Sequence, residues 1–258
     1  MKTSIRVAQI RIVPEKGNLE GNHERLMSSL GDIARGSVDV VVTPECFLDG
    51  YVSTEDWVTR DNIRDYAVDP RDSPYVDAAS AWARENGAWV VFGCSRLSPE
   101  GVYNTAVLLD REGRRRGFYD KTHCQTHDKK YVPGERIPVF ESEFGRFGVL
   151  ICADRRWPET VRSLALQGAR VIFNPTYGMY DEKNMRMMQT RSYESEVFIA
   201  FTHPRQSLLT GPTGDIICDD THEGAPFSVT EIDLSQVDEI RAGCSAHLRD
   251  MRPELYVN

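Results

Sequence analysis

The sequence lacks the features that mark membrane, secreted and nucleic-acid-binding proteins. No apolar run approaches the ~20 residues of a membrane-spanning helix, and the first four residues lead directly into a predicted strand. We therefore expect neither a membrane span nor a signal peptide. No basic run is interleaved with aromatic residues, and the net charge is −8. This combination argues against a nucleic-acid binder.

Cysteines are few and scattered along the chain. No two of the six stand in a C-x-x-C pair, and they form no dense framework. This distribution favours reduced thiols over disulfides or a zinc site, so we expect a reducing compartment, the cytoplasm. The six are Cys46, Cys94, Cys124, Cys152, Cys218 and Cys244.

What the sequence does contain is typical of one large globular α/β domain. The chain has 258 residues, of which 40% are hydrophobic and 27% charged, and it is long enough to bury a substantial core. It shows no low-complexity linker and no break in composition. We therefore predict a single domain over residues 1–258, with its core at about 4–234 and a C-terminal tail at 235–258.

Helical and strand patterns alternate along the chain. The order helix–strand–helix–strand–strand–strand occurs twice, at roughly 1–120 and 145–232, although no residue-level repeat is visible. Two sheets stacked face to face, with helices on both outer sides, would bury the β-branched strands on both faces. Strands are predicted at 5–10, 38–42, 88–94, 102–110, 115–119, 147–151, 169–174, 197–202, 207–209, 216–217 and 228–232, and helices at 17–32, 73–85, 159–167 and 184–195, with a polar loop at 125–134 and a helix and tail at 234–258.

Residues 148–159 place a cysteine between a buried strand and a helix. Trp157-Pro158 opens the predicted helix, because proline is favoured in a first helical turn, and Asp154 is placed to cap it. Cys152 would then lie near unpaired backbone N–H groups and the positive end of a helix, which favours a thiolate. The alternative is a small buried residue at the end of a core strand. This stretch alone does not decide between a nucleophile and a core residue.

Three reactive residues each finish an apolar strand: Glu45, Lys121 and Cys152. Ligands bind at strand ends in α/β sheets. Taken singly, each has a structural alternative: a loop carboxylate, a solvated charge or a core thiol. Together they supply what amide hydrolysis requires, because a thiol attacks the carbonyl carbon, a carboxylate passes its proton to the departing amine, and an ammonium with a backbone N–H stabilises the oxyanion.

Three longer segments surround these residues. They read T-P-E-C-F-L-D-G-Y at 43–51, Y-D-K-T-H at 119–123 and I-C-A-D-R-R-W-P-E at 151–159. In their order and spacing they resemble the three motifs of the nitrilase superfamily of carbon–nitrogen hydrolases. The resemblance covers almost the whole chain, with further similar segments at 131–134, 167–169, 191–194, 212–215 and 252–256.

The resemblance implies a fold, an assembly and a set of roles. The fold is a four-layer αββα sandwich of two mixed β-sheets flanked by helices, with no metal and no cofactor. The assembly is a homodimer or higher homo-oligomer that stacks sandwiches across a shared helix face, where we expect the tail at 235–258 to pack. Glu45 would be the general base, Lys121 the transition-state stabiliser and Cys152 the nucleophile, with the N–H of Ala153 as the oxyanion partner.

The chain departs from the family pattern at two places that shape the pocket. Family members usually carry a second glutamate seven residues before the glycine of the Pro-Gly motif. Here that position is His127, with Asp128 beside it, and which of the two replaces the glutamate stays open. His127 could act as a hydrogen-bonding group with a near-neutral pKa, or it could be a surface histidine. Where the family has an asparagine after a later strand, this chain has Thr202-His203.

The segment after the cysteine is most similar to the N-carbamoyl-amino-acid amidohydrolase branch, in which an arginine after Cys-x-Asp holds the substrate carboxylate. This implies that Arg155 or Arg156 binds substrate, for which a planar guanidinium is suited. The alternative is an internal salt bridge with Glu159 or Asp154. Tyr177 could line the pocket, or pack at its rim.

We therefore predict a hydrolase of non-peptide carbon–nitrogen bonds in small linear amides or N-carbamoyl compounds, working through a cysteine thioester with release of ammonia. Its partners would be small-molecule substrates. One alternative is a nitrilase acting on small nitriles, although Ala153-Asp154 stands where true nitrilases have Trp-Glu, which favours amides. The other is a binding protein on the same fold that has lost turnover.

Overall fold

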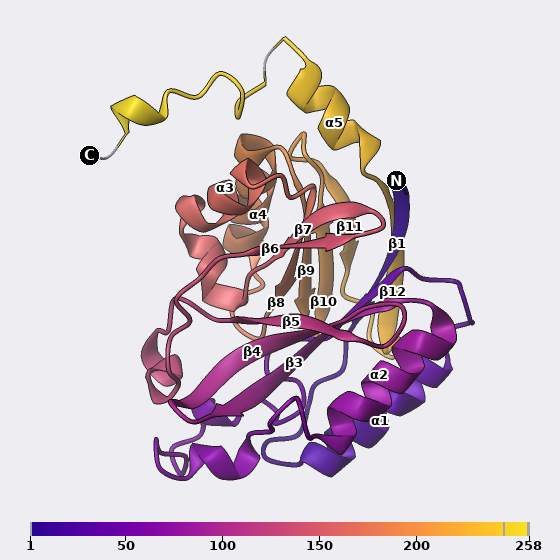
Figure 1. Ribbon diagram of the computed structural model, residues 1–258, viewed down its shortest axis with the longest axis vertical. Helices are drawn as coiled ribbons and strands as arrows, with labels where there is room; N and C mark the ends of the chain where they lie inside the picture. The colour runs from indigo at the N-terminus through magenta and orange to yellow at the C-terminus, as the bar shows by residue number, and fades with distance from the viewer. Residues whose placement is uncertain (1, 245, 257–258) are drawn as a thin grey trace.

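The computed structural model describes residues 2–244 and 246–256. Two six-stranded β-sheets lie face to face, and helices cover the outer face of each (Figure 1). Both sheets are mixed, because parallel strands form their centres and antiparallel strands their margins. This is the αββα architecture that the resemblance implied.

The first sheet has the order β12–β1–β2–β3–β4–β5, in which β1, β2 and β3 are parallel. Helices α1 (Leu19–Gly31) and α2 (Pro74–Asn86) pack on its outer face. The strands are β1 (Ser4–Ile10), β2 (Val40–Val42), β3 (Trp89–Ser98), β4 (Gly101–Leu109), β5 (Arg115–Asp120) and β12 (Phe227–Asp233).

The second sheet has the order β11–β10–β9–β8–β7–β6, in which β7, β8 and β9 are parallel. Helices α3 (Pro158–Leu166) and α4 (Glu182–Ser195) belong to this half of the sandwich. The strands are β6 (Val139–Ser142), β7 (Gly145–Val149), β8 (Val171–Pro175), β9 (Phe198–His203), β10 (Gln206–Thr210) and β11 (Ile216–Asp220).

The two halves repeat one topology. The same order of elements occurs in both halves: β1-α1-β2-α2-β3-β4-β5 in the first and β7-α3-β8-α4-β9-β10-β11 in the second. Each sheet also has one extra antiparallel strand beside its first parallel strand, β12 beside β1 and β6 beside β7. The sequence pattern predicted this recurrence but missed β6, a short strand whose half-buried residues show no clear alternation. Because β12 pairs with β1, the end of the chain completes the sheet that the start of the chain begins.

The centre of the sandwich is built by strands that are apolar on both faces. In β2, Val40 and Val42 pack between the two sheets, while Val41 packs beneath α1 and α2. Successive strand residues point to opposite faces, so a strand covered on both sides needs an uninterrupted apolar run. The run of valines therefore leads the chain into a buried turn, where Glu45 lies.

Short 3-10 helices occupy several connections that carry site residues. The predicted loop at 125–134 contains η3 (Thr126–Lys130), and Cys152 begins η4 (Cys152–Arg156). The others are η1 (Val52–Thr54), η2 (Ile63–Tyr66) and η5 (Pro253–Leu255).

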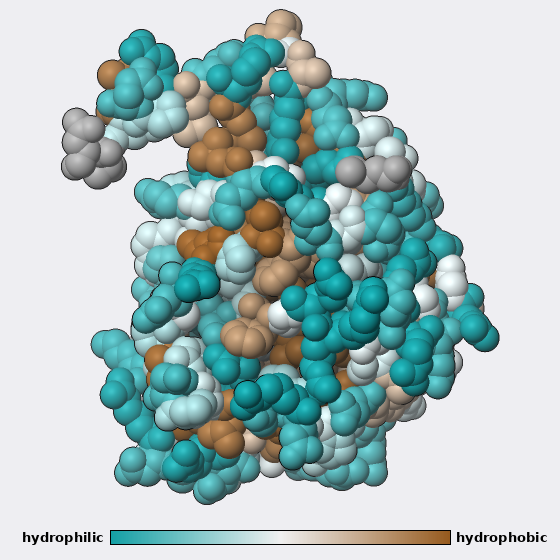
Figure 2. Space-filling view, in the orientation of Figure 1, coloured by the Kyte–Doolittle hydropathy of each residue, from teal (hydrophilic) through white to brown (hydrophobic). Residues whose placement is uncertain are grey.

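After α5 (Ser235–Ala242) the chain runs outward from the sandwich toward η5 (Figure 1). Figure 2 shows apolar residues along a band down the middle of the same face, between hydrophilic margins. The tail expected at an oligomer interface is partly covered by the structure, since residues 245 and 257–258 lie outside the described residues. Within residues 2–244 and 246–256, no helix combines the length and apolar character that crossing a membrane requires.

Candidate active site

The three residues that the sequence singled out converge at one edge of the sandwich. Glu45 follows β2, Lys121 follows β5, and Cys152 follows β7. The Lys121 Nζ donates to Glu45 Oε1 at 2.6 Å, and both side chains are buried. The backbone N–H of Tyr177 donates to Glu45, and a β-carbon placed on the next residue, Gly178, would lie 3.5 Å from the Cys152 sulfur, so the thiol lies close to the pair. Strands from two different sheets thus supply one cluster.

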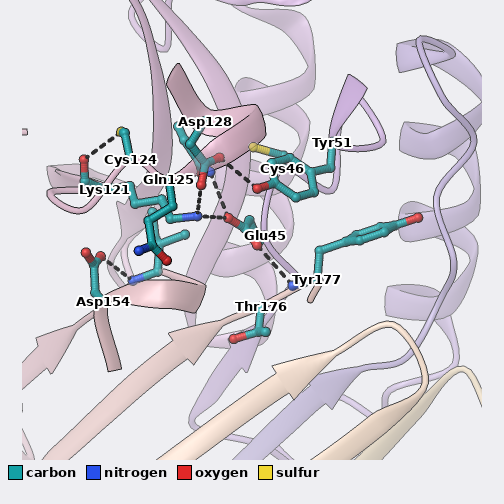
Figure 3. A network of polar contacts seen from close by, with 12 residues as sticks. Glu45, Cys46, Tyr51, Lys121, Cys124, Gln125, Asp128, Asp154, Thr176 and Tyr177 are labelled. Atoms are coloured by element: carbon teal, nitrogen blue, oxygen red, sulfur yellow. Dashed lines mark hydrogen bonds and ion pairs between the residues drawn. The ribbon is translucent and has the colours of Figure 1, made fainter. Parts of the chain in front are cut away.

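Glu45 is held from three directions. Besides Lys121, the Asn104 Nδ2 donates to Oε1 at 2.8 Å, and the backbone N–H of Tyr177 donates to Oε2 at 3.0 Å. The close-up shows the carboxylate between the Lys121 ammonium and the Tyr177 nitrogen (Figure 3). Burial raises the pKa of Glu45, and the positive charge of Lys121 opposes that rise. A carboxylate of this kind is ready to take up a proton.

A second carboxylate completes the lysine's surroundings. Asp128, in η3, accepts a hydrogen bond from Lys121 Nζ at 2.5 Å and another from the Tyr51 hydroxyl at 2.7 Å. Figure 3 shows the ammonium between the two carboxylates. Burial opposes the charge on Lys121, but Glu45, Cys152 and Asp128 together outweigh it and hold the pKa of Lys121 well above its usual value.

His127 lies at the surface of η3. Its side chain is exposed, while the adjacent Asp128 is buried against Lys121. Neighbouring residues of a 3-10 turn point in different directions, so only one of the two can face the site. The acidic position that the sequence left open between His127 and Asp128 is therefore occupied by Asp128.

Cys152 lies at a strained turn. Its φ is +44°, a left-handed conformation that costs energy for any residue except glycine, and such strain is found at functional sites. The helix predicted at 159–167 is α3, and the short η4 stands between it and the strand, so that Cys152 begins η4. Burial and the nearby Glu45 raise the pKa of Cys152, while Lys121 opposes them. The site therefore favours a neutral thiol at rest, and the thiolate expected from a helix end is not supported.

Asp154 ties the cysteine turn to the lysine strand instead of capping α3 as predicted. Its buried carboxylate accepts from the backbone N–H of Ile151 at 3.0 Å and from the Tyr119 hydroxyl at 2.7 Å. It also accepts from the backbone N–H of His123 at 2.9 Å. Trp157, the N-cap residue of α3, makes no side-chain hydrogen bond to the helix. Asp154 thereby connects the segments that carry Cys152 and Lys121.

A backbone segment missed by sequence reasoning forms the third wall of the site. The N–H of Tyr177 donates to Glu45, and the backbone N–H of Gly178, next to the Cys152 sulfur, lowers the pKa of that thiol. Tyr177 thus contributes its backbone, while its ring packs against that of Tyr51 at 5.4 Å. A backbone N–H is the same in every residue type except proline, so the sequence could not indicate this segment. The sequence analysis also missed Asn104, which could have been noticed because it is a polar residue within an otherwise largely apolar strand.

The two arginines after the cysteine point in different directions. Arg155 is buried: its Nε donates to Asn184 Oδ1 at 2.7 Å and its Nη2 to the Met179 carbonyl at 2.7 Å. Its Nη1 is buried without a hydrogen-bond partner among the described residues, and its charge lowers the pKa of Cys152. Arg156 is exposed and donates to Gln125 Oε1 at 3.0 Å. Only Arg155 therefore faces the site, and neither arginine forms the salt bridge weighed as an alternative.

Ala153 lies buried directly after Cys152 in η4, which is compatible with the oxyanion role that the resemblance implies. Among the described residues, no group of three or more His, Cys, Asp or Glu side chains is placed to hold a metal ion. The two carboxylates of the cluster bind Lys121 instead.

Comparisons with known proteins identify the family and the fold of this chain. A family model described as carbon–nitrogen hydrolase matches residues 4–242. A nitrilase of Pyrococcus abyssi is 27% identical over 266 residues, which cover 98% of this chain and 99% of the relative. An N-carbamoylputrescine amidase of Arabidopsis thaliana is 25% identical over 256 residues, 86% of this chain and 84% of the relative. The structure of Saccharomyces cerevisiae Nit3, a member of branch 10 of the nitrilase superfamily, matches 99% of this chain and 98% of its own with a TM-score of 0.82 at 21% identity.

Proposed function

The chain belongs to the carbon–nitrogen hydrolase family, and we propose that it hydrolyses small linear amides or N-carbamoyl compounds through a thioester on Cys152. The observation that carries this proposal is the Lys121 ammonium, bonded to both Glu45 and Asp128 beside a buried thiol. This is the arrangement that acyl transfer from an amide requires: a nucleophile, a base and an electrophilic stabiliser within one cluster.

In the proposed acylation step, the Glu45 carboxylate takes the proton of the Cys152 thiol as sulfur attacks the substrate carbonyl carbon. The negative charge that develops on the carbonyl oxygen is stabilised by the Lys121 ammonium and the N–H of Ala153. Glu45 then gives the proton to the departing nitrogen, the carbon–nitrogen bond breaks, and ammonia leaves.

In the deacylation step, water attacks the thioester carbon while Glu45 accepts a proton from it. The carbon–sulfur bond breaks, the acid is released, and the proton returns to the sulfur. Glu45 therefore acts as a base in both steps: it takes the proton of the neutral thiol in acylation and a proton of water in deacylation. The contacts from Asn104 and the Tyr177 N–H keep its carboxylate oriented for this exchange.

The proposal is tested by incubating the protein with small amides, N-carbamoyl amino acids and nitriles and measuring ammonia. We expect ammonia from amides or carbamoyl compounds, and an acyl adduct on Cys152 by mass spectrometry. Ammonia from nitriles but not from amides would instead identify a nitrilase. No ammonia from any compound, with Cys152 unreactive toward iodoacetamide at neutral pH, would favour a binding protein.

We also propose that Arg155 recognises a carboxylate or another acceptor on the substrate. Its Nη1 is buried and has no partner among the described residues, while Asn184 and the Met179 carbonyl orient the rest of the guanidinium. A planar guanidinium held by two fixed acceptors is prepared for a further acceptor.

Arg155→Lys should therefore raise the KM for carboxylate-bearing substrates by about 10–100-fold, because a hydrogen bond to a charged group is lost. The KM for uncharged amides should change much less. The measurement is steady-state kinetics on matched substrate pairs with and without the carboxylate. Arg156→Lys is the matched control, since Arg156 is exposed, and it should change neither value. Equal effects of Arg155→Lys on both substrates would contradict the role.

We also propose that the chain forms a homodimer or higher homo-oligomer. Large apolar side chains are exposed on α3 and α4, at Leu166 and Tyr193, and in the tail at Leu255 and Tyr256. Tyr256 and Tyr193 line one hollow between the tail and these helices. We propose that this helix face and the tail form the contact between copies of the chain.

A further inference from the structure

One peptide group connects the Cys152 thiol to a buried histidine. The peptide between Tyr177 and Gly178 lies against the thiol, and the N–H of Gly178 lowers the pKa of Cys152. A β-carbon placed on Gly178 would lie 3.5 Å from the Cys152 sulfur, which confirms how closely this backbone approaches it. The carbonyl of the same peptide accepts a hydrogen bond from His203 Nε2 at 2.8 Å. In a trans peptide the N–H and C=O point in opposite directions, so one group spans the two side chains.

The surroundings of His203 set its tautomer. The backbone N–H of Arg205 donates to Nδ1 at 3.1 Å, so Nδ1 is the acceptor. The ring proton therefore resides on Nε2 and is donated to the Tyr177 carbonyl. The ring is 4% exposed, and it stacks on Tyr180 with centroids 4.2 Å apart. The donor is thus buried and directed at one oxygen.

Resting on the proposed function of Cys152 as nucleophile, we propose that His203 is a positioning residue. Its Nε2–H orients and polarises the Tyr177–Gly178 peptide so that the Gly178 N–H stabilises the sulfur when the thiol loses its proton. Hydrogen bonds in a chain strengthen one another, because donation to the carbonyl makes the N–H of the same amide a better donor. The same segment carries the Tyr177 N–H that holds Glu45.

Other charged and titratable groups face the thiol from every side, and the test must leave them unchanged. Glu45 faces it from the turn after β2, Lys121 from the end of β5, Arg155 from η4, and Tyr51 from the turn before η1.

Burial, together with the two cationic neighbours Arg155 and Arg205, lowers the pKa of His203 to about 4. The ring is therefore neutral near pH 7. Replacing it with another neutral side chain leaves the charge near the thiol unchanged, so such a replacement tests the hydrogen bond of His203 rather than its charge.

The experiment compares two isosteric replacements, His203→Gln and His203→Met. Glutamine carries an N–H donor with a reach similar to that of Nε2, whereas methionine has a similar size and no donor. The readout is the rate of Cys152 alkylation by iodoacetamide from pH 6 to 10, followed by mass spectrometry of the Cys152 peptide. This rate follows the thiolate fraction and requires no knowledge of the substrate.

We expect His203→Gln to alkylate within about threefold of the wild type. His203→Met should react about tenfold more slowly at pH 7, with the midpoint of its profile about one pH unit higher. Without His203 the peptide is no longer held, and the Gly178 N–H no longer stabilises the thiolate, a loss equal in size to one hydrogen bond to a charged group. His222→Phe is the control, because this histidine is 90% exposed in its side chain, and its profile should match the wild type.

Identical profiles for the glutamine and methionine variants overturn the proposal, whether both match the wild type or both are slow. Should the methionine variant fail to fold, His203→Asn replaces it, because an asparagine donor stops about one bond length short of the Tyr177 carbonyl. The asparagine variant is expected to be slow, and wild-type reactivity in it also overturns the proposal. A wild type that alkylates but releases no ammonia from any substrate contradicts the proposed function alone.

Discussion

Cys152→Ala should abolish ammonia release, with turnover falling at least ~10⁴-fold. A covalent mechanism loses its essential step when the nucleophile is removed, and residues that act as a unit lose almost all of their effect together. The fold should remain intact, because replacing a cysteine with alanine removes little volume.

The measurements are ammonia release and thermal unfolding of the same preparation. Cys218→Ala is a matched control, because this half-buried thiol lies on β11, where it contacts the Ser207 carbonyl. It should retain full turnover. If the Cys152→Ala protein still releases ammonia at a rate near that of the wild type, Cys152 is not the nucleophile.

Lys121→Met is expected to lower both turnover and stability. Turnover should fall about 10³-fold, the cost of removing one preorganised donor to the oxyanion. The free energy of unfolding at pH 7 should fall by about 3–5 kcal/mol, because two buried carboxylates, Glu45 and Asp128, are left without their cation. Methionine has a similar length and volume, so the loss is one of charge rather than of packing. Urea denaturation measures the stability, and ammonia release the turnover.

The destabilisation by Lys121→Met should depend on pH in a defined direction. Burial already raises the pKa of Glu45, and removing Lys121 takes away the charge that opposes this rise. A carboxyl whose pKa is higher in the folded than in the unfolded chain stabilises the fold below its unfolded pKa, and this contribution is lost as the pH rises. The difference in stability between variant and wild type should therefore be largest at neutral pH and shrink as the pH falls through the raised pKa of Glu45 in the variant, which lies above the usual pKa of a glutamate.

The double variant Lys121→Met/Asp128→Asn separates the two effects of the lysine. Removing one of the two carboxylates should restore part of the lost stability, because the like-charge repulsion disappears. It should restore no turnover, because the ammonium is still missing. Equal stability of Lys121→Met and the wild type at pH 7 would contradict the view that the ammonium neutralises the two carboxylates.

Much of the fold could be predicted from local patterns. Continuous apolar runs such as 40–42 are typical of strands covered on both faces, and the Asn86-Gly87 exit of α2 is a local signal. The recurrence of the order helix–strand–helix–strand–strand–strand in the two halves could be predicted because it depends on the same local patterns. Strand β6 and the 3-10 turns were not, because short and half-exposed segments lack a periodicity that distinguishes them from loop.

The sequence by itself determined which residue types stand at the ends of β2, β5 and β7, because these are local properties of the motifs. Only the tertiary structure decided that Asp128 rather than His127 meets Lys121 and that Arg155 rather than Arg156 faces inward. It also decided that the backbone of Tyr177 and Gly178 closes the site. Adjacent residues of a short turn point in different directions, and backbone donors are the same for every residue type. Such choices are therefore set by packing between distant segments, and no local pattern contains them.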